Sequence, residues 1–206
     1  MTSDRKKRQI TALSVCVAIL AGASSPAFAI QANPPSMIET GQTSQPIGHA
    51  QFCAQYADEC HSTRKANPMV LTQARWDELV DINALVNHSI EQLTDQQIYN
   101  VVEHWTYPDR VGDCEDLVLL KRFMLIKRGW KPANLLITVA RQPNGEGHAV
   151  LTARTDRGDF ILDNLRDPVM RWDQTEYRYL KRIARGHSGK WVSINDDRSV
   201  ITGSIN

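Results

Sequence analysis

Apolar residues recur at helical spacing in two parts of the chain. Residues 72–93 show the first pattern, with Thr72 as the predicted N-cap and one face formed by Trp76, Leu79, Val80, Asn83, Val86 and Ile90. Residues 113–129 show a broader apolar face, formed by Leu117, Leu120, Phe123, Met124 and Ile126. Gly129 is a residue type that commonly follows a helix. We therefore predict two helices, of which the second is central and buried.

Beyond the second helix the pattern changes to short β-rich runs. These cover residues 134–141, 148–154 and 159–164, and the turn sequences QPNGEG and TDRGD separate them, so they predict an antiparallel meander. Residues 171–184 favour a short helix, and residues 190–194 a last strand. Helices followed by strands predict an α+β domain, with N-terminal helices packed on an antiparallel sheet.

The N-terminus has the layout of a secretory signal peptide. A basic DRKKR start is followed by an apolar run and by the small-residue end SPAFA, so we predict a signal over residues 1–29, cut after Ala29. The run is short of the roughly 20 apolar residues that span a bilayer. The alternative is a buried or disordered N-terminal helix. The signal predicts an exported, periplasmic protein that does not span the membrane after cleavage.

Residues 30–49 contain three prolines and mostly polar residues, without apolar periodicity. We predict that this segment is a disordered leader. The folded domain is then expected over residues 50–206, which is an ordinary size for one domain.

The charge balance excludes one class of partner. The whole chain carries +1, and residues 1–29 hold four basic residues and one acidic residue, so the remainder is near −2. Such a chain has no basic surplus for binding nucleic acid or an anionic membrane surface.

The four cysteines separate into three groups. Cys16 lies in the predicted signal, and Cys53 and Cys60 are close enough in sequence to pair in an oxidising compartment. Cys114 is left without a partner. A lone thiol in an exported protein is either a buried small hydrophobe or a reactive group.

Cys114 stands where the second helix begins. Unpaired N–H groups and the helix dipole favour an anion there, which promotes the thiolate and provides donors for an oxyanion. His148 opens the second strand of the meander and Asp163 closes the third, so neighbouring strands would place the imidazole beside a carboxylate. The pattern predicts a nucleophile, a base and an orienting acid.

Each of these residues also has a simpler interpretation. Cys114 taken alone also fits an inert core residue, and His148 taken alone a turn residue. Asp163, followed by an asparagine, is ordinary turn chemistry after a strand.

The strings GDCEDLVLLKRFMLIKRG, GHAVL and FILDNL resemble those of the bacterial transglutaminase-like cysteine proteinases, over residues 52–194. The resemblance implies a papain- and transglutaminase-like fold with Cys114 as nucleophile, His148 as general base and Asp163 as orienting acid. It also implies a protein substrate, namely a surface adhesin of the biofilm type or another envelope protein, and an inner-membrane regulatory protein as a partner.

Three carboxylates flank the cysteine, at Asp113, Glu115 and Asp116. Like charges would raise the pKa of the thiol, whereas the same oxygens bound to Ca²⁺ would no longer repel the thiolate. The resemblance implies calcium dependence with these residues as ligands, Asp116 being the weaker candidate. The alternative is that acidic residues in a first turn only stabilise the helix dipole and cap free N–H groups.

Three functions fit these residues. The first is a thiol peptidase that acts on an exposed segment of another protein. The second is a transglutaminase or amidase that uses the same thiol. The third is a non-enzymatic, calcium-binding interaction module.

Overall fold

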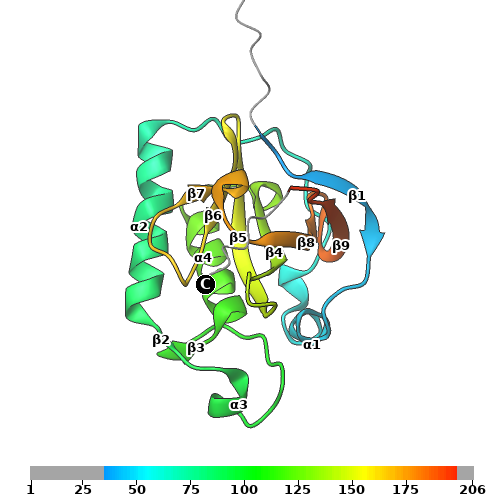
Figure 1. The fold of residues 1–206 in the computed structure, drawn as a ribbon, viewed down its shortest axis with the longest axis vertical. Helices are drawn as coiled ribbons and strands as arrows, with labels where there is room; N and C mark the ends of the chain where they lie inside the picture. The colour runs from blue at the N-terminus through cyan, green and yellow to red at the C-terminus, as the bar shows by residue number, and fades with distance from the viewer. Residues whose placement is uncertain (1–34, 199–206) are drawn as a thin grey trace, which may run out of the picture. The chain divides into compact units, whose positions relative to one another are not determined.

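The structure is a computed structural model that describes residues 35–198 (Figure 1). Within these residues no helix has the length and apolar character needed to cross a membrane. The predicted signal peptide, residues 1–29, lies outside the described residues, as do residues 30–34 and 199–206.

A seven-stranded sheet forms the centre of the fold. Its order is β1-β9-β8-β4-β5-β6-β7, and each neighbouring pair is antiparallel. The strands are β1 (Ile38–Thr43), β4 (Leu135–Arg141), β5 (Gly147–Thr155), β6 (Gly158–Leu162), β7 (Met170–Arg171), β8 (Arg178–Ala184) and β9 (His187–Asn195). The predicted meander is β4-β5-β6, so the α+β prediction is confirmed.

Helices α2 and α4 lie side by side against one face of the sheet (Figure 1). The helices are α1 (Ile47–Gln55), α2 (Gln73–Ser89), α3 (Asp95–Ile98) and α4 (Cys114–Lys127), with 3₁₀ turns η1 (Ala57–Glu59), η2 (Pro132–Asn134) and η3 (Trp172–Gln174). A small parallel pair, β2 (Glu91–Gln92) and β3 (Val111–Gly112), joins the end of α2 to the approach to α4.

The alternation of side chains along β5 buries both of its faces. Ala149 and Leu151 belong to the larger core, which α2 and α4 share with the sheet. Val150 points into a smaller core that contains Tyr177 and Tyr179. Period-2 alternation thus makes β5 the boundary between two apolar layers.

Both predicted helices form, and their ends follow local capping chemistry. The Thr72 side chain accepts a hydrogen bond from the Arg75 N–H, which confirms Thr72 as the N-cap of α2. The chain leaves α4 at Gly129, which has φ = +89°, and the N–H groups of Gly129 and Trp130 bond the carbonyls of Ile126 and Leu125. This pairing closes the helix as a Schellman motif, in which glycine removes the strain of a positive φ.

The prediction of a helix over residues 171–184 is wrong. These residues form the short turn η3 and then strand β8, which lies between β4 and β9. Arg182 in β8 is buried because it binds Glu39 and Asp159. In the sequence, a charged residue such as Arg182 indicates an exposed position. The pattern of residues 171–184 therefore resembles a helix with one exposed face, although these residues include a buried strand.

The disordered leader predicted for residues 30–49 is also corrected where the structure describes it. Residues 38–43 form β1, which pairs with β9, and α1 begins at Ile47. Most β1 side chains are exposed, so the strand lacks an apolar pattern and is held by its backbone bonds and by Glu39. The folded domain therefore begins before residue 50.

Candidate active site

Cys114 is the first residue of α4, and Asp113 is the N-cap. It is partly buried and is a free thiol, whereas Cys53 and Cys60 are joined by a disulfide. Gly112 allows the chain to approach the helix closely, because a Cβ there would lie 3.0 Å from the Asp116 side chain. The Gly-Asp-Cys string thus places a thiol at a helix N-terminus beside a crowded carboxylate.

Cys114 and His148 line the same cavity, whose volume is about 460 Å³. His148 is near the start of β5, and Asp163 directly follows β6. Because β5 and β6 are antiparallel neighbours, the end of β6 returns to the start of β5. Helix α4 packs on β5 and supplies the cysteine.

His148 and Asp163 form a buried pair. The distance from His148 Nε2 to Asp163 Oδ1 is 2.8 Å, and the two side chains are 2% and 4% exposed. Asp163 also accepts hydrogen bonds from the hydroxyl of Tyr177 and the N–H of Leu165. Burial raises the pKa of Asp163, but these bonds and the charge of His148 outweigh it and hold the pKa below its ordinary value. The carboxylate is therefore ionised and accepts from the imidazole.

Asp113 and Asp116 form a cluster with a residue that sequence analysis missed, Asp95. One carboxylate oxygen from each of the three lies within 4.8 Å of the others. Asp95 Oδ1, Asp113 Oδ1 and Asp116 Oδ2 are buried without hydrogen-bond partners among the described residues. Asp95 follows Thr94 in a capping box, so its sequence context indicates only the start of α3.

The clustering and burial of these three carboxyl groups favour their protonated forms. Burial, followed by the neighbouring charges, raises the pKa of Asp113 to about 6 and of Asp116 to about 7. Burial also raises the pKa of Asp95. Carboxylates so placed are costly to keep ionised without a cation.

Glu115 is not one of these three carboxylates, although it lies close to Asp113, and its side chain faces the thiol. Cys114 Sγ donates to Glu115 Oε2 at 3.0 Å. Burial, and then the charge of Asp113, raises the pKa of Glu115 to about 9. Burial, and then Glu115, raises the pKa of the Cys114 thiol well above its ordinary value. In this arrangement the sulfur carries its proton.

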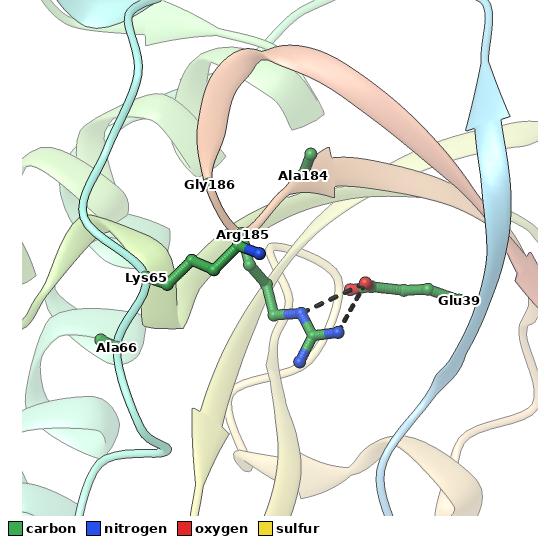
Figure 2. Close-up of a pocket in the computed structure, with 6 residues that line it drawn as sticks. All are labelled: Glu39, Lys65, Ala66, Ala184, Arg185 and Gly186. Carbon is green, nitrogen blue, oxygen red and sulfur yellow. Dashed lines mark hydrogen bonds and ion pairs between the residues drawn. The ribbon is translucent and has the colours of Figure 1, made fainter.

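A second cavity, of about 370 Å³, lies elsewhere on the fold (Figure 2). Two hydrogen bonds, of 3.2 and 2.9 Å, join Arg185 to Glu39 across it. Its remaining lining residues are Lys65, Ala66, Ala184 and Gly186. This cavity holds no cysteine and no histidine, so the candidate site is the cavity that Cys114 and His148 line.

Comparison with known proteins places the chain in a family. The model of the bacterial transglutaminase-like cysteine proteinases (BTLCP) matches residues 39–199. No curated protein matches the chain. Among solved structures, calcium-bound LapG of Legionella pneumophila is similar at 24% identity and a TM-score of 0.47, over 52% of this chain and 64% of that one. EGTA-treated LapG of the same organism is similar at 23% identity and a TM-score of 0.49, over 62% of this chain and 74% of that one. This chain thus spans less than two thirds of the calcium-bound LapG chain.

Proposed function

Because the chain belongs to the bacterial transglutaminase-like cysteine proteinases and is therefore a cysteine peptidase, we propose that Cys114, His148 and Asp163 are its catalytic triad. The observation that carries this proposal is the buried 2.8 Å contact between His148 and Asp163, beside a cavity that Cys114 and His148 both line.

In the proposed triad the imidazole exchanges a proton with the thiol. An ionised carboxylate only accepts hydrogen bonds, so His148 Nε2 carries the proton toward Asp163, and Nδ1 of the neutral ring is the free base. His148 then takes the proton of Cys114. The sulfur attacks the peptide carbonyl carbon, and the carbonyl electron pair moves to the oxygen.

Collapse of that intermediate breaks the C–N bond, and His148 gives its proton to the leaving amine. The acyl group remains on sulfur as a thioester. Water then attacks the thioester while His148 takes a proton from it, and the C–S bond breaks to release the acid. The first N–H groups of α4 have no intrahelical acceptor and would donate to the oxyanion.

We propose calcium as the cofactor, held by Asp95, Asp113 and Asp116. Three buried oxygens without partners fit a hard cation that prefers carboxylate ligands. When bound, calcium would supply positive charge near the N-terminus of α4 and so favour the thiolate over the thiol. Glu115 also stays proposed as a ligand, although here its side chain accepts from Cys114.

We also propose that the enzyme acts in the periplasm, where it would cleave a surface adhesin or another envelope protein. An inner-membrane regulatory protein would control this cleavage. The signal-like sequence of residues 1–29 supports export. The near-neutral charge supports a protein substrate rather than a nucleic acid.

A library of peptides from an envelope-protein digest, with its amines blocked, tests the proposal. Incubation with residues 30–206 in calcium should create new N-termini, detected by mass spectrometry. Cys114→Ala and His148→Ala should create none, and the exposed Lys127→Met should match the unsubstituted chain.

An added primary amine distinguishes hydrolysis from acyl transfer. A peptidase forms free carboxylates even when the amine is in excess, whereas a transglutaminase forms amides. Cleavage that survives Cys114→Ala would overturn the proposed triad.

A further inference from the structure

Tyr177 binds the carboxylate that holds His148. Its hydroxyl donates to Asp163 Oδ2 at 2.6 Å, while Asp163 Oδ1 accepts from His148 and from the N–H of Leu165 at 3.0 Å. Both carboxylate oxygens are thus occupied. The carboxylate cannot rotate about its own axis without breaking at least one of these bonds.

Tyr177 also covers the pair. Its ring lies against the His148 ring edge to face, with centroids 5.2 Å apart. Counted over the whole residue, Tyr177 is 3% exposed, His148 is 5% exposed and Asp163 is 3% exposed. Hydrogen bonds shielded from water are stronger and hold their geometry better than exposed ones.

The hydroxyl is a permanent donor. Burial raises the pKa of Tyr177, and the carboxylate of Asp163 raises it further. The Tyr177 proton therefore stays in place while the proton of His148 moves during a reaction cycle.

The segment before β8 contacts the loop that carries Asp163 and the C-terminal end of the described chain. Glu176 pairs with Arg166 at 2.9 Å, and Arg198 donates to the backbone carbonyl of Tyr177 at 2.7 Å. Tyr177 also packs in the smaller core against Tyr179. The tyrosine is thus anchored independently of the carboxylate it binds.

We propose that Tyr177 is a positioning residue of the active site: its hydroxyl fixes the second oxygen of Asp163, and its ring shields the His148–Asp163 hydrogen bond. This inference rests on the proposed triad. Tyr177 does not line the cavity of Cys114, and it acts through Asp163 on the orientation of the imidazole.

Two matched substitutions test it, Tyr177→Phe and Tyr179→Phe. Both remove a buried hydroxyl from neighbouring positions, but that of Tyr179 bonds Thr175 at 2.7 Å and does not touch Asp163. The probe is iodoacetamide, and the rate of Cys114 modification is measured by intact mass in calcium buffer at one pH near neutrality. A second readout is the side-chain N–H proton resonance of His148 in histidine-labelled protein.

Tyr177→Phe should slow modification about tenfold, because misplaced catalytic groups lose rate steeply. It should also shift the His148 resonance, while Tyr179→Phe changes neither. The resonance reports only folded molecules, so partial unfolding cannot imitate this result.

The inference is overturned if Tyr177→Phe leaves the rate of Cys114 modification unchanged, or if it leaves the His148 resonance unmoved. His148→Ala separates this failure from failure of the triad. If His148→Ala slows modification and Tyr177→Phe does not, only the role of Tyr177 is wrong. If His148→Ala has no effect either, the triad itself is wrong.

Discussion

At the scale of single residues, the site depends on buried charges that have definite partners. His148 and Asp163 could be predicted from the sequence because each stands at the end of a β-rich run in the meander. Tyr177 could not, because residues 171–184 favoured a helix instead of η3 and β8, and Asp95 could not, because its capping context indicates only the start of α3. Lys121 is a further buried titratable side chain, on α4, and its Nζ has no hydrogen-bond partner among the described residues.

Asp163→Asn should lower peptide cleavage by about 10²- to 10⁴-fold, because an amide that donates to the imidazole holds the wrong tautomer. The matched control is Asp167→Asn, at an exposed aspartate of the same loop that contacts His88. It should leave cleavage unchanged. Equal cleavage rates for the two variants would remove Asp163 from the mechanism.

Lys121→Met should stabilise the fold at neutral pH by about 1–3 kcal/mol, since it removes a desolvated amine that has no hydrogen-bond partner among the described residues. Burial lowers the pKa of Lys121 to about 7, although Asp163 and Asp167 partly offset it. An unfolded lysine titrates near 10.4. Between these values the unfolded state binds more protons, so this lysine makes stability rise with pH from about 7 to about 10.

Urea unfolding at several pH values measures this effect. The rise should be smaller in Lys121→Met, and the exposed Lys127→Met should retain it. If the free energy of unfolding rises with pH as steeply in Lys121→Met as in the unsubstituted chain, Lys121 is not a buried amine with a lowered pKa.

At the scale of elements, α3 and the N-terminus of α4 together form the acidic cluster. Capping signals predicted α2 and α4 closely, because N-caps and a C′ glycine are local. Strand β8 was missed because its buried arginine pairs with a residue 143 positions away. The helices could therefore be predicted from local sequence signals, whereas strand β8 depends on pairing with residues far away in the chain.

Calcium should raise the thermal midpoint of the protein, and EGTA should reverse the rise. Binding to the native state alone adds about 2.7 kcal/mol at 100 times the Kd. Asp95→Asn should abolish the calcium-dependent shift because it removes one of three clustered carboxylates. Asp167→Asn, outside the cluster, should keep the shift. Differential scanning fluorimetry measures both, and a shift that survives in Asp95→Asn would place the cation elsewhere.

At the scale of the whole molecule, the first and last described strands pair with each other at one edge of the sheet. β1 pairs with β9, and Glu39 of β1 reaches the buried Arg182 at 2.8 Å. Burial raises the pKa of Glu39, but Arg182 and Arg185 outweigh it and hold the pKa below its ordinary value. Polar edge strands of this kind carry little sequence signal, which is why residues 38–43 resembled a leader.

Glu39→Gln should therefore destabilise the fold by about 1–3 kcal/mol near neutral pH, since it leaves part of the Arg182 charge uncompensated. A carboxyl group whose pKa is lowered by folding stabilises the protein at pH values above its pKa in the unfolded state. This stabilisation is lost as the pH falls through its pKa in the folded state. The loss should accordingly fade in acid. Chemical denaturation at neutral and acidic pH measures it, with exposed Glu91→Gln as the control.

The most direct test of the central claim is the rate at which iodoacetamide modifies Cys114 in residues 30–206, read by intact mass with calcium and with EGTA. The disulfide of Cys53 and Cys60 leaves Cys114 as the reporting thiol. We expect rapid modification of Cys114 in calcium. Both EGTA and the substitution His148→Ala should slow it strongly. Modification that is equally slow in calcium, in EGTA and in His148→Ala would show a thiol without an activating base or cation, and would contradict the account.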